Sequence, residues 1–475
     1  MMESVRRMAF AGVGVFALGL ALGTAACSSA DGGTPGTPVQ GGDGTDADGG
    51  GGGTLGGGTA GGGGSTAAPD AGGVKGGGED AQGPTGDAGA KPPTTDGGAG
   101  AGPTGDGGLG ELHVVRGSGG APGHIVDGAG NPVAIHGADR SGTEFGCLSG
   151  NFSDGPVDQT GLDAMKAWHI NAVRVPMNED CWLGINGVPA AYSGANYQKA
   201  LADWVTLITE NGMIAIIDLH WTAAGGSQSN AQQPMADADH APAFWSQVAK
   251  AFASNGQVIF DLFNEPFLTD WGCWVKGGSC AQANGANYQV AGMAALLQAV
   301  RSAGAQNVVI LGGLAYSSDL TQWVTSVNSI PGLAAPLNGI SIDNVAASWH
   351  SYDFNGQSGC PSQYNGYSTS DTCDSADVTA TNTGAKSVLA AGFPVLIGEL
   401  GISAFSAQSA SSFSSTQVTQ ITGWFDGLMT WMEQQGQGYV AWSWNTDTNP
   451  VLVTDYQGTP TVDFGETYKA HLKNF

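Results

Sequence analysis

The stretch 241–266 has the sequence APAFWSQVAKAFASNGQVIFDLFNEP and contains one unit of a pattern that the rest of the chain repeats. Its first half, Ala241–Ala253, is patterned as a helix, and Val258–Phe263 is a short apolar run typical of a buried strand. The polar residues Asn264 and Glu265 follow where that run ends. The stretch therefore predicts a helix and then a buried strand with a carboxyl group at its C-terminal end.

From Leu112 onward, short β-branched runs alternate with helix-patterned segments. The predicted strands are Val133–His136, Ala172–Pro176, Ile214–His220, Val258–Phe263, Val308–Leu311, Val345–His350, Val395–Glu399 and Val440–Trp444. Further predicted helices are Gly161–Trp168, Tyr197–Glu210, Ala286–Ala303 and Thr416–Gln434. Eight strands that alternate with helices predict an α/β fold, a (β/α)8 TIM barrel over residues 111–475. An open doubly wound sheet is the alternative, but no GxGxxG follows the first strand.

Two further short runs precede the predicted barrel. Leu112–Arg116 and His124–Val126, with turn residues at Asp127–Gly130, predict a β-hairpin. We expect this hairpin to plug the lower end of the barrel.

The N-terminus has the pattern of an export signal. Arg6 and Arg7 precede an apolar run, Met8–Leu22, that is too short to span a bilayer comfortably, so we expect residues 1–26 to be a signal peptide. The run ends in Leu-Gly-Thr-Ala-Ala-Cys, which resembles a bacterial lipobox with Thr24 in place of the usual aliphatic residue. Lipidation of Cys27 would give an exported cell-surface lipoprotein, and ordinary cleavage would give an extracellular protein.

Residues 28–110 form a segment of different composition. They contain no Phe, Trp or Tyr and are dominated by Gly, Ala, Thr, Pro and Asp. Such a segment cannot bury enough apolar surface to offset the entropy of ordering it. We therefore predict that residues 27–110 are a lipidated cysteine followed by a disordered tether, with a span of roughly 50 Å by random-coil scaling.

Six cysteines remain after Cys27, an even number that indicates disulfides in an exported chain. Six cysteines allow fifteen pairings, and we favour the sequential one: Cys147 with Cys181, Cys273 with Cys280, and Cys360 with Cys373. No CxxC pair or histidine cluster accompanies them. We expect no metal site and no cofactor.

The charge of the chain restricts its partners. The formal net charge is −26, and residues 111–475 hold 30 acidic and 11 basic side chains. Nucleic acid and anionic membrane surfaces are therefore excluded as expected partners, which leaves the lipid anchor as the contact with a membrane. A neutral polysaccharide is compatible with this charge, and we expect a monomer.

Two glutamates at the ends of different strands are what glycoside hydrolysis requires. In a TIM barrel the catalytic face lies at the C-terminal ends of the strands. Glu265 and Glu399 fall there, and one carboxyl group could protonate the leaving oxygen while the other stabilises the oxocarbenium-like centre. Taken singly, Glu265 could merely cap a loop and Glu399 could pair with a core arginine.

Six motifs strengthen this interpretation as a set. They resemble those of glycoside hydrolase family 5, the cellulase-type retaining glycosidases, in the same order: Val173-Arg174-Val175-Pro176, Asp218-Leu219-His220-Trp221, Phe263-Asn264-Glu265-Pro266, His350-Ser351-Tyr352, Ile397-Gly398-Glu399 and Ala441-Trp442-Ser443-Trp444. The resemblance covers residues 112–475. It implies double displacement, with Glu399 as nucleophile, Glu265 as acid/base and the two carboxyl groups roughly 5–5.5 Å apart.

The resemblance also implies roles for the neighbouring side chains. Arg174 and Tyr352 would hydrogen-bond Glu399, and Asn264 would contact the sugar 2-hydroxyl. The remaining predicted substrate contacts are His220, His350 and Trp442, of which Trp442 would stack on the cleaved sugar and precede a cis peptide bond. Each histidine could instead be a packed barrel residue, and Trp444 could be a core residue.

The substrate is less sharply predicted than the mechanism. The block Asp139-Arg140-Ser141-Gly142-Thr143-Glu144 resembles cellulase-type members, which favours an endo-acting β-1,4-glucanase. Mannan, xyloglucan and galactan are alternative substrates within the family. From a different functional class, a catalytically silent glycan-binding lipoprotein is the competing hypothesis.

Aromatic and acidic residues are concentrated in the predicted loops. Exposed tryptophans would be sugar-stacking subsites, unless they cover apolar loop bases; they are Trp182, Trp271, Trp274 and Trp323. Glu179 and Asp180 could bind a sugar hydroxyl or pair with Arg140, and Asp237 and Asp239, beside His240, could line the cleft or bind calcium. Their spacing matches no known metal motif, so we expect solvated loops for both acidic pairs.

Overall fold

The computed structural model describes residues 109–281, 287–333, 343–353, 383–403 and 413–475. Four sequence predictions lie outside these residues. They are the signal peptide 1–26, the lipidation site Cys27, all but the last two residues of the tether, and the Cys360–Cys373 disulfide.

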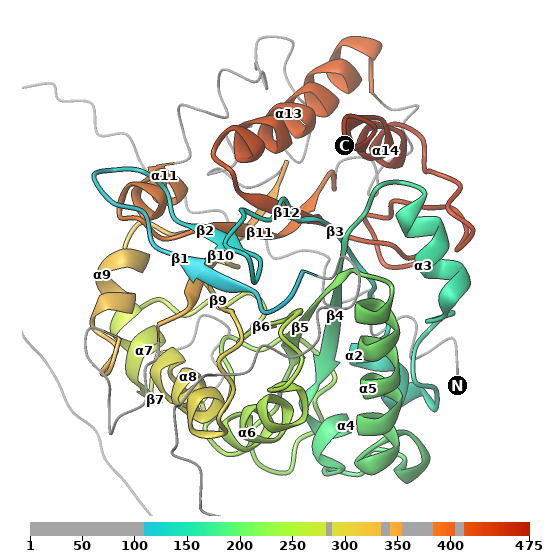
Figure 1. The fold of residues 1–475 in the computed structure, drawn as a ribbon. Helices are drawn as coiled ribbons and strands as arrows, with labels where there is room; N and C mark the ends of the chain where they lie inside the picture. The colour runs from blue at the N-terminus through green and yellow to red at the C-terminus, as the bar shows by residue number, and fades with distance from the viewer. Residues whose placement is uncertain (1–108, 282–286, 334–342, 354–382, 404–412) are drawn as a thin grey trace, which may run out of the picture. The chain divides into compact units, whose positions relative to one another are not determined.

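Eight parallel strands close a barrel within the described residues (Figure 1). They are β3 (His136–Asp139), β4 (Ala172–Asn178), β5 (Ile214–Trp221), β6 (Val258–Asp261), β9 (Val309–Gly312), β10 (Val345–Tyr352), β11 (Val395–Gly401) and β12 (Gly438–Ala441). Each strand pairs in parallel with its neighbours along the chain, and β12 pairs with β3 to complete the circle. The prediction of a TIM barrel is confirmed.

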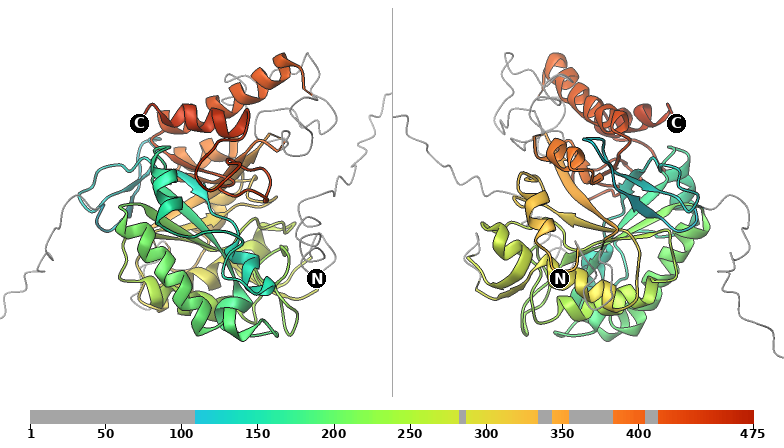
Figure 2. Two further views of the ribbon diagram at one scale, coloured as in Figure 1. Left: turned by 90° about the vertical axis from the view of Figure 1, so that its right-hand side faces the viewer. Right: turned by 60° about the vertical axis from the view of Figure 1, so that its left-hand side comes forward.

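Helices surround the strands. The α-helices are α2 (Thr143–Gly146), α3 (Gln159–Lys166), α4 (Glu179–Leu183), α5 (Ala195–Glu210), α6 (Ala241–Phe252), α7 (Trp271–Lys276), α8 (Met293–Ser302), α9 (Trp323–Asn328), α11 (Thr383–Ala390), α13 (Ser415–Gln434) and α14 (Phe464–Leu472). Short 3-10 helices follow α2 at Cys147–Ser149 and precede α5 at Ala190–Tyr192. Helices α13 and α14 lie together on one side of the barrel, with α5 and α6 on the other (Figure 2). Within the described ranges, no helix combines the length and apolarity needed to cross a bilayer.

Several predicted elements have other bounds in the structure, and the last barrel strand, for example, is Gly438–Ala441 rather than Val440–Trp444. The first barrel strand begins at His136 rather than Val133, because the Val133 N–H donates to the Ile125 carbonyl in the preceding hairpin. The predicted helix Ala286–Ala303 is wrong in its first half. Gln289–Ala291 forms strand β8, which pairs antiparallel with β7 (Gly277–Ser279), and α8 begins only after Gly292. Apolar spacing alone did not reveal that these residues had a strand partner.

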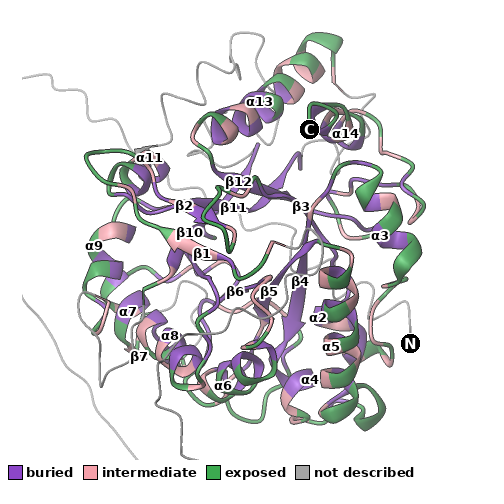
Figure 3. Cartoon of the chain, viewed as in Figure 1, coloured by how far each residue is buried: buried purple, intermediate pink, exposed green. Residues whose placement is uncertain are grey.

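The predicted hairpin lies across the N-terminal end of the barrel. Strands β1 (His113–Val115) and β2 (His124–Val126) pair antiparallel, and Leu112 and Ile125 join a core cluster with strand-start residues such as Ile214. The barrel strands are buried, whereas the outer faces of α5 and α6 carry exposed residues (Figure 3). The hairpin therefore closes one end and leaves the catalytic face of the fold at the other.

Two predicted disulfides are present, and both brace loops on the C-terminal side of the strands. Cys147 pairs with Cys181 and thus ties the segment after β3 to α4. Cys273 pairs with Cys280 and ties α7 to the end of β7. Each of these bridges limits the freedom of a long loop.

The loop tryptophans are buried, so their interpretation as exposed sugar-stacking subsites is wrong. Relative exposure is at most 8% for the set Trp182, Trp271, Trp274 and Trp323. The indole of Trp274 donates to the Gly312 carbonyl at 2.8 Å, and that of Trp323 donates to the Leu311 carbonyl at 3.0 Å. These rings pack against the end of β9 and cover the apolar bases of the loops.

Candidate active site

The strand ends bring every predicted catalytic and substrate-contacting side chain to one place. Arg174 lies on β4, His220 on β5, His350 and Tyr352 on β10, and Glu399 on β11. Asn264 and Glu265 follow β6, and Trp442 follows β12. Because the strands are parallel, residues more than 200 positions apart in the chain meet on one face.

Glu399 receives two strong hydrogen-bond donors. Arg174 Nη1 lies 3.0 Å from Glu399 Oε1, and the Tyr352 hydroxyl donates to Glu399 Oε2 at 2.7 Å. Burial raises the pKa of Glu399, the nearby His350 and Arg174 act to lower it, and Glu265 acts to raise it. A guanidinium together with a phenol donor favours the ionised carboxylate over the protonated one.

Glu265 has a more exposed setting with neutral partners. Its side chain is 17% exposed, and its backbone has a positive φ of 55°. Gln232 donates to Glu265 Oε2 at 2.7 Å, and His350 Nδ1 lies 3.1 Å from Oε1. Burial raises the pKa of Glu265, and the Gln232 hydrogen bond partly opposes the rise. Gln232 was missed from the sequence, since an amide in a polar loop gives no distinguishing pattern.

The two carboxyl groups stand close together around one imidazole. One oxygen of Glu265, one oxygen of Glu399 and a ring nitrogen of His350 all lie within 4.8 Å of one another. Burial lowers the pKa of His350 to about 3, so its ring is neutral at neutral pH. The arrangement could accept a cation geometrically, but Arg174 already supplies positive charge to Glu399. Burial raises the pKa of both glutamates, and each carboxyl group lies close to the other, so the pair favours holding one proton between them.

Arg174 also contacts three aspartates that the sequence analysis did not single out. Its guanidinium lies 3.1 Å from Asp139, 3.3 Å from Asp218 and 3.0 Å from Asp261. Burial raises the pKa of Asp139 well above its usual range and raises the pKa of Asp218 and Asp261 to about 7. One guanidinium thus faces four buried carboxyl groups, some of which keep their protons near neutral pH. The sequence feature that could have revealed these aspartates is an acidic residue in an otherwise apolar predicted strand.

His220, Asn264 and Trp442 form the wall beside the carboxyl pair. His220 Nδ1 lies 2.8 Å from Asp218 Oδ2, and the ring stacks on Trp442 at a centroid distance of 5.5 Å. Arg174 donates to Asn264 Oδ1 at 2.8 Å, which fixes that amide. The Trp442–Ser443 peptide bond is cis, as expected. Trp444 is fully buried and packs edge-on against Trp168, so it is a core residue.

An aromatic pair with one exposed ring adjoins Glu265 and was also missed. Tyr316 follows β9, is 47% exposed, and stacks on Phe267 at a centroid distance of 4.8 Å. Its backbone N–H donates to the carbonyl of Pro266, the residue after Glu265. Burial raises the pKa of Tyr316, and the charge of Glu265 adds to the rise. This ring is an accessible apolar surface at the edge of the candidate site.

The expectation of solvated loops is wrong for three of the four residues in the two acidic pairs. Glu179, Asp180 and Asp237 are fully buried, and Asp239 alone is exposed. Arg140 pairs with Asp154 at 3.0 Å, not with Glu179 or Asp180. Burial follows because α4 and the loop before α6 fold inward over the end of β5.

A closed (β/α)8 barrel with two close carboxyl groups at its C-terminal face defines a glycosidase-type barrel enzyme. The cellulase model of glycosyl hydrolase family 5 matches residues 126–448, and the chain belongs to this family. It is a glycoside hydrolase by that membership, and the family resemblance seen in the sequence is confirmed.

One known protein resembles part of the chain in sequence, and two solved structures resemble it in fold. An endoglucanase of Thermobifida fusca is 25% identical over 151 residues, which are 31% of this chain and only 28% of that protein. A β-glucanase from Saccharophagus degradans aligns with a TM-score of 0.51 at 15% identity, over 77% of this chain and 93% of its own. A thermostable, halotolerant family 5 cellulase from an Icelandic hot spring isolate aligns with a TM-score of 0.50 at 18% identity, over 77% and 96%.

Proposed function

We propose that the protein is a retaining endo-β-glycanase that hydrolyses β-1,4-glucan by double displacement. The observation that carries the proposal is the carboxyl pair, in which an oxygen of Glu265 and an oxygen of Glu399 lie within 4.8 Å. Retaining glycosidases place their carboxyl groups about 5–5.5 Å apart, whereas inverting enzymes need about 6.5–9.5 Å to admit a water molecule. The spacing favours direct attack by Glu399.

The unequal surroundings of the two carboxyl groups assign their roles. Glu399, with its guanidinium and phenol donors, is the ionised group and attacks the anomeric carbon. Glu265, with amide and imidazole partners, holds a proton and donates it to the departing oxygen. Once the glycosyl group is bound to Glu399, Glu265 deprotonates the water that releases it. Its partial exposure gives that water access.

Supporting side chains orient the sugar. Asn264, held by Arg174, contacts the 2-hydroxyl, where hydrogen bonding strengthens toward the transition state. Trp442 stacks on the sugar that is cleaved, and His220 beside it orients ring hydroxyls. Tyr316 lies on the side of Glu265, which is the side of the leaving group, and stacks on the next sugar there.

Two observations support glucan as the substrate. The curated relative is an endoglucanase, and the β-glucanase from Saccharophagus degradans, with a TM-score of 0.50 in this comparison, forms a complex with cellotetraose. The panel that tests this choice contains carboxymethylcellulose, mannan, xyloglucan and galactan. Carboxymethylcellulose is expected to lose viscosity faster than reducing ends accumulate, as endo cleavage requires. Preferred hydrolysis of another polymer would overturn the substrate, not the mechanism.

The mechanism has its own test with an aryl β-cellobioside. We expect Glu399→Ala to abolish turnover and azide to restore it with release of an α-glycosyl azide, because azide would enter the space of the nucleophile. Glu265→Ala should yield the β-glycosyl azide instead. If the wild-type protein hydrolyses no β-glycan, the proposed enzymatic function is wrong and the glycan-binding hypothesis remains.

We also propose that the enzyme is exported and held at the cell surface through Cys27. The support is the lipobox-like sequence and the Gly-rich tether that follows it. Cys27→Ser is expected to release activity from the membrane fraction into the medium. Activity that stays in the membrane fraction of this variant would contradict lipid anchoring.

A further inference from the structure

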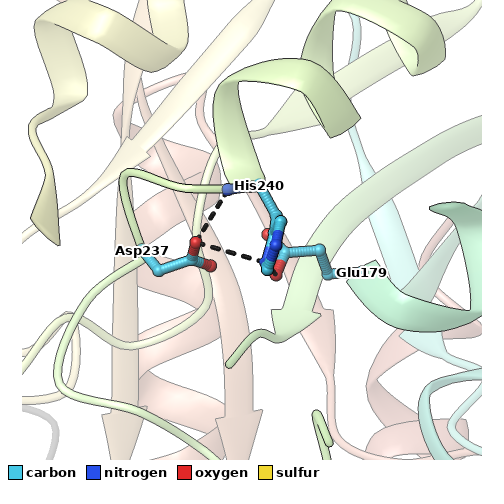
Figure 4. Close-up of side chains that lie close together, drawn as sticks. All are labelled: Glu179, Asp237 and His240. Atoms are coloured by element: carbon cyan, nitrogen blue, oxygen red, sulfur yellow. Dashed lines mark hydrogen bonds and ion pairs between the residues drawn. The ribbon is translucent and has the colours of Figure 1, made fainter. Parts of the chain in front are cut away.

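A second group of ionisable side chains lies outside the candidate active site (Figure 4). Glu179 begins α4, Asp237 lies in the loop after β5, and His240 immediately precedes α6. His240 Nδ1 is 3.8 Å from Glu179 Oε1 and 3.6 Å from Asp237 Oδ1. One oxygen of each carboxyl group and one ring nitrogen all lie within 4.8 Å of one another. We call these three residues the Glu179 cluster.

The negative charge of the Glu179 cluster is poorly compensated. Glu179 and Asp237 are fully buried, and in the described part of the chain their salt-bridge partner is the same side chain, His240. Asp237 Oδ1 accepts two backbone N–H groups, and Thr222 Oγ1 contacts both carboxyl groups. Glu179 Oε2, however, is buried without any hydrogen-bond partner. Buried charges are normally paired or bound to a metal ion, so this oxygen points to a missing cation.

We propose that Glu179, Asp237 and His240 bind a divalent transition-metal ion, with zinc and manganese as the best fit. Two carboxylates and one imidazole form a donor set that both ions accept, whereas calcium requires six to eight oxygen ligands. A tetrahedral centre with ligands about 2.0–2.2 Å away separates its ligand atoms by about 3.3–3.6 Å. His240 Nδ1 is 3.6 Å from Asp237 Oδ1 and 3.8 Å from Glu179 Oε1, and these separations need only a small contraction. Glu179 Oε2, the second oxygen of the same carboxyl group, is the one without a partner. His240 Nδ1 also lies 3.3 Å from the Ala223 carbonyl, a contact that a bound ion would replace.

The surroundings of the Glu179 cluster show how an ion could reach it and what a bound ion would hold in place. The His240 side chain is 23% exposed, which gives an ion a route from solvent. The loop that carries Asp237 also carries Gln232, the amide that donates to Glu265. A bound ion would thus tie α4 and the start of α6 together and hold this loop in place. The ligands are separated by 58 and 3 positions in the chain, so no sequence motif could show them together.

The test uses the full chain without a polyhistidine tag, stripped with EDTA and dialysed. Zinc, manganese and calcium are added separately, bound metal is counted by mass spectrometry of the dialysed protein, and the unfolding temperature is measured. We expect about one equivalent of zinc or manganese, and a rise in unfolding temperature of about 3–4 °C at a hundredfold excess over the dissociation constant. Calcium should produce no such rise.

Matched variants locate the site. His240→Asn and Glu179→Gln should each lose the bound equivalent and the temperature rise, while both remain folded because the replacements are polar and similar in size. His169→Asn is the control, since His169 is an exposed histidine that precedes β4, whereas Glu179 follows the opposite end of that strand. It should bind metal as wild type does.

Two results would overturn the proposal. The first is that the wild-type protein binds neither zinc nor manganese and that its unfolding temperature does not change when either ion is added. A Glu179→Gln variant as stable as wild type would strengthen this result. A proton shared by the two carboxyl groups would then balance the charge of the cluster. The second is a bound equivalent that persists in both His240→Asn and Glu179→Gln, which would place the ion elsewhere. Neither result depends on glycosidase activity, so the proposed reaction is tested separately.

Discussion

The candidate active site and the Glu179 cluster both bury several carboxyl groups, but they compensate the charge by different means. In the active site, Arg174 supplies a permanent cation to Glu399 and three aspartates. In the Glu179 cluster, two buried carboxyl groups share one partly exposed histidine. A built-in guanidinium favours the charged form of the nucleophile near neutral pH, whereas a cluster without one must take up a proton or a metal ion.

Removing Arg174 should produce the largest effect and would test this contrast directly. Arg174→Ala leaves Glu399 and the aspartates without their cation, and breaking such a buried pair costs about 3–5 kcal/mol. We expect a loss of that size in the free energy of unfolding at pH 7, measured with urea, and a smaller loss at pH 4, where the carboxyl groups are protonated. Arg174→Lys, which keeps the charge, should lose less. An alanine variant as stable as wild type would show that Arg174 does not balance these groups.

Tyr352→Phe tests the second donor to Glu399. A hydrogen bond to a charged group contributes about 1.5–3 kcal/mol, so its loss should reduce kcat on an aryl β-cellobioside by about 10- to 150-fold. Stability should change much less, because the ring stays in place. Tyr316→Phe is the matched control, since that hydroxyl lies at an exposed edge, and it should leave kcat near wild type. Equal kcat values for Tyr352→Phe and wild type would contradict the role of the phenol.

The raised pKa of Asp218 predicts a pH dependence of stability. Its pKa is about 7 in the folded protein against 3.8 for an ordinary aspartate, so the folded state binds the proton more tightly than the unfolded state. The contribution to stability is complete below about pH 4 and is lost as the pH rises through about 7. Asp218→Asn should therefore show a shallower fall in unfolding free energy over this range. Parallel profiles for variant and wild type would mean that Asp218 does not titrate there.

Gln232→Ala should produce the smallest effect. The amide hydrogen bond lowers the pKa of Glu265, so its removal should raise that pKa further. Because Glu265 must be protonated to act as the acid, the alkaline limb of the kcat/KM profile should move to higher pH. Gln228→Ala, on the same loop but bonded to Asn186, is the control and should leave the limb in place. A shift to lower pH in Gln232→Ala would refute this account of Glu265.

The sequence predicted the barrel and the site residues because their signals are local. Buried strands such as Ile214–Trp221 have continuous apolar runs, and their ends place His220 and Glu399 on one face by the geometry of the fold alone. The charge around Arg174 was not predicted in full. Asp139 and Asp261 are the last residues of β3 and β6, and their contact with Arg174 forms only once the barrel closes.

Features that depend on contacts between distant segments were not predicted, because local sequence patterns do not reveal such contacts. The helix expected at Ala286–Ala303 has the right composition, but β8 finds a partner in β7 that helical spacing does not reveal. The burial of Glu179 and Asp237 likewise depends on two segments that meet only in the folded chain. Local patterns fix element types, whereas the environment of a buried charge depends on tertiary contacts.

The central claim is that Glu399 attacks the sugar directly, and the anomer released first tests it most directly. Proton NMR of a cello-oligosaccharide digest, recorded before mutarotation equilibrates the products, reports that anomer. Two successive inversions, the first made by Glu399 and the second by water, predict that the β-anomer forms first. The α-anomer as first product would mean a single inversion by water, and would contradict the assignment of Glu399 as nucleophile.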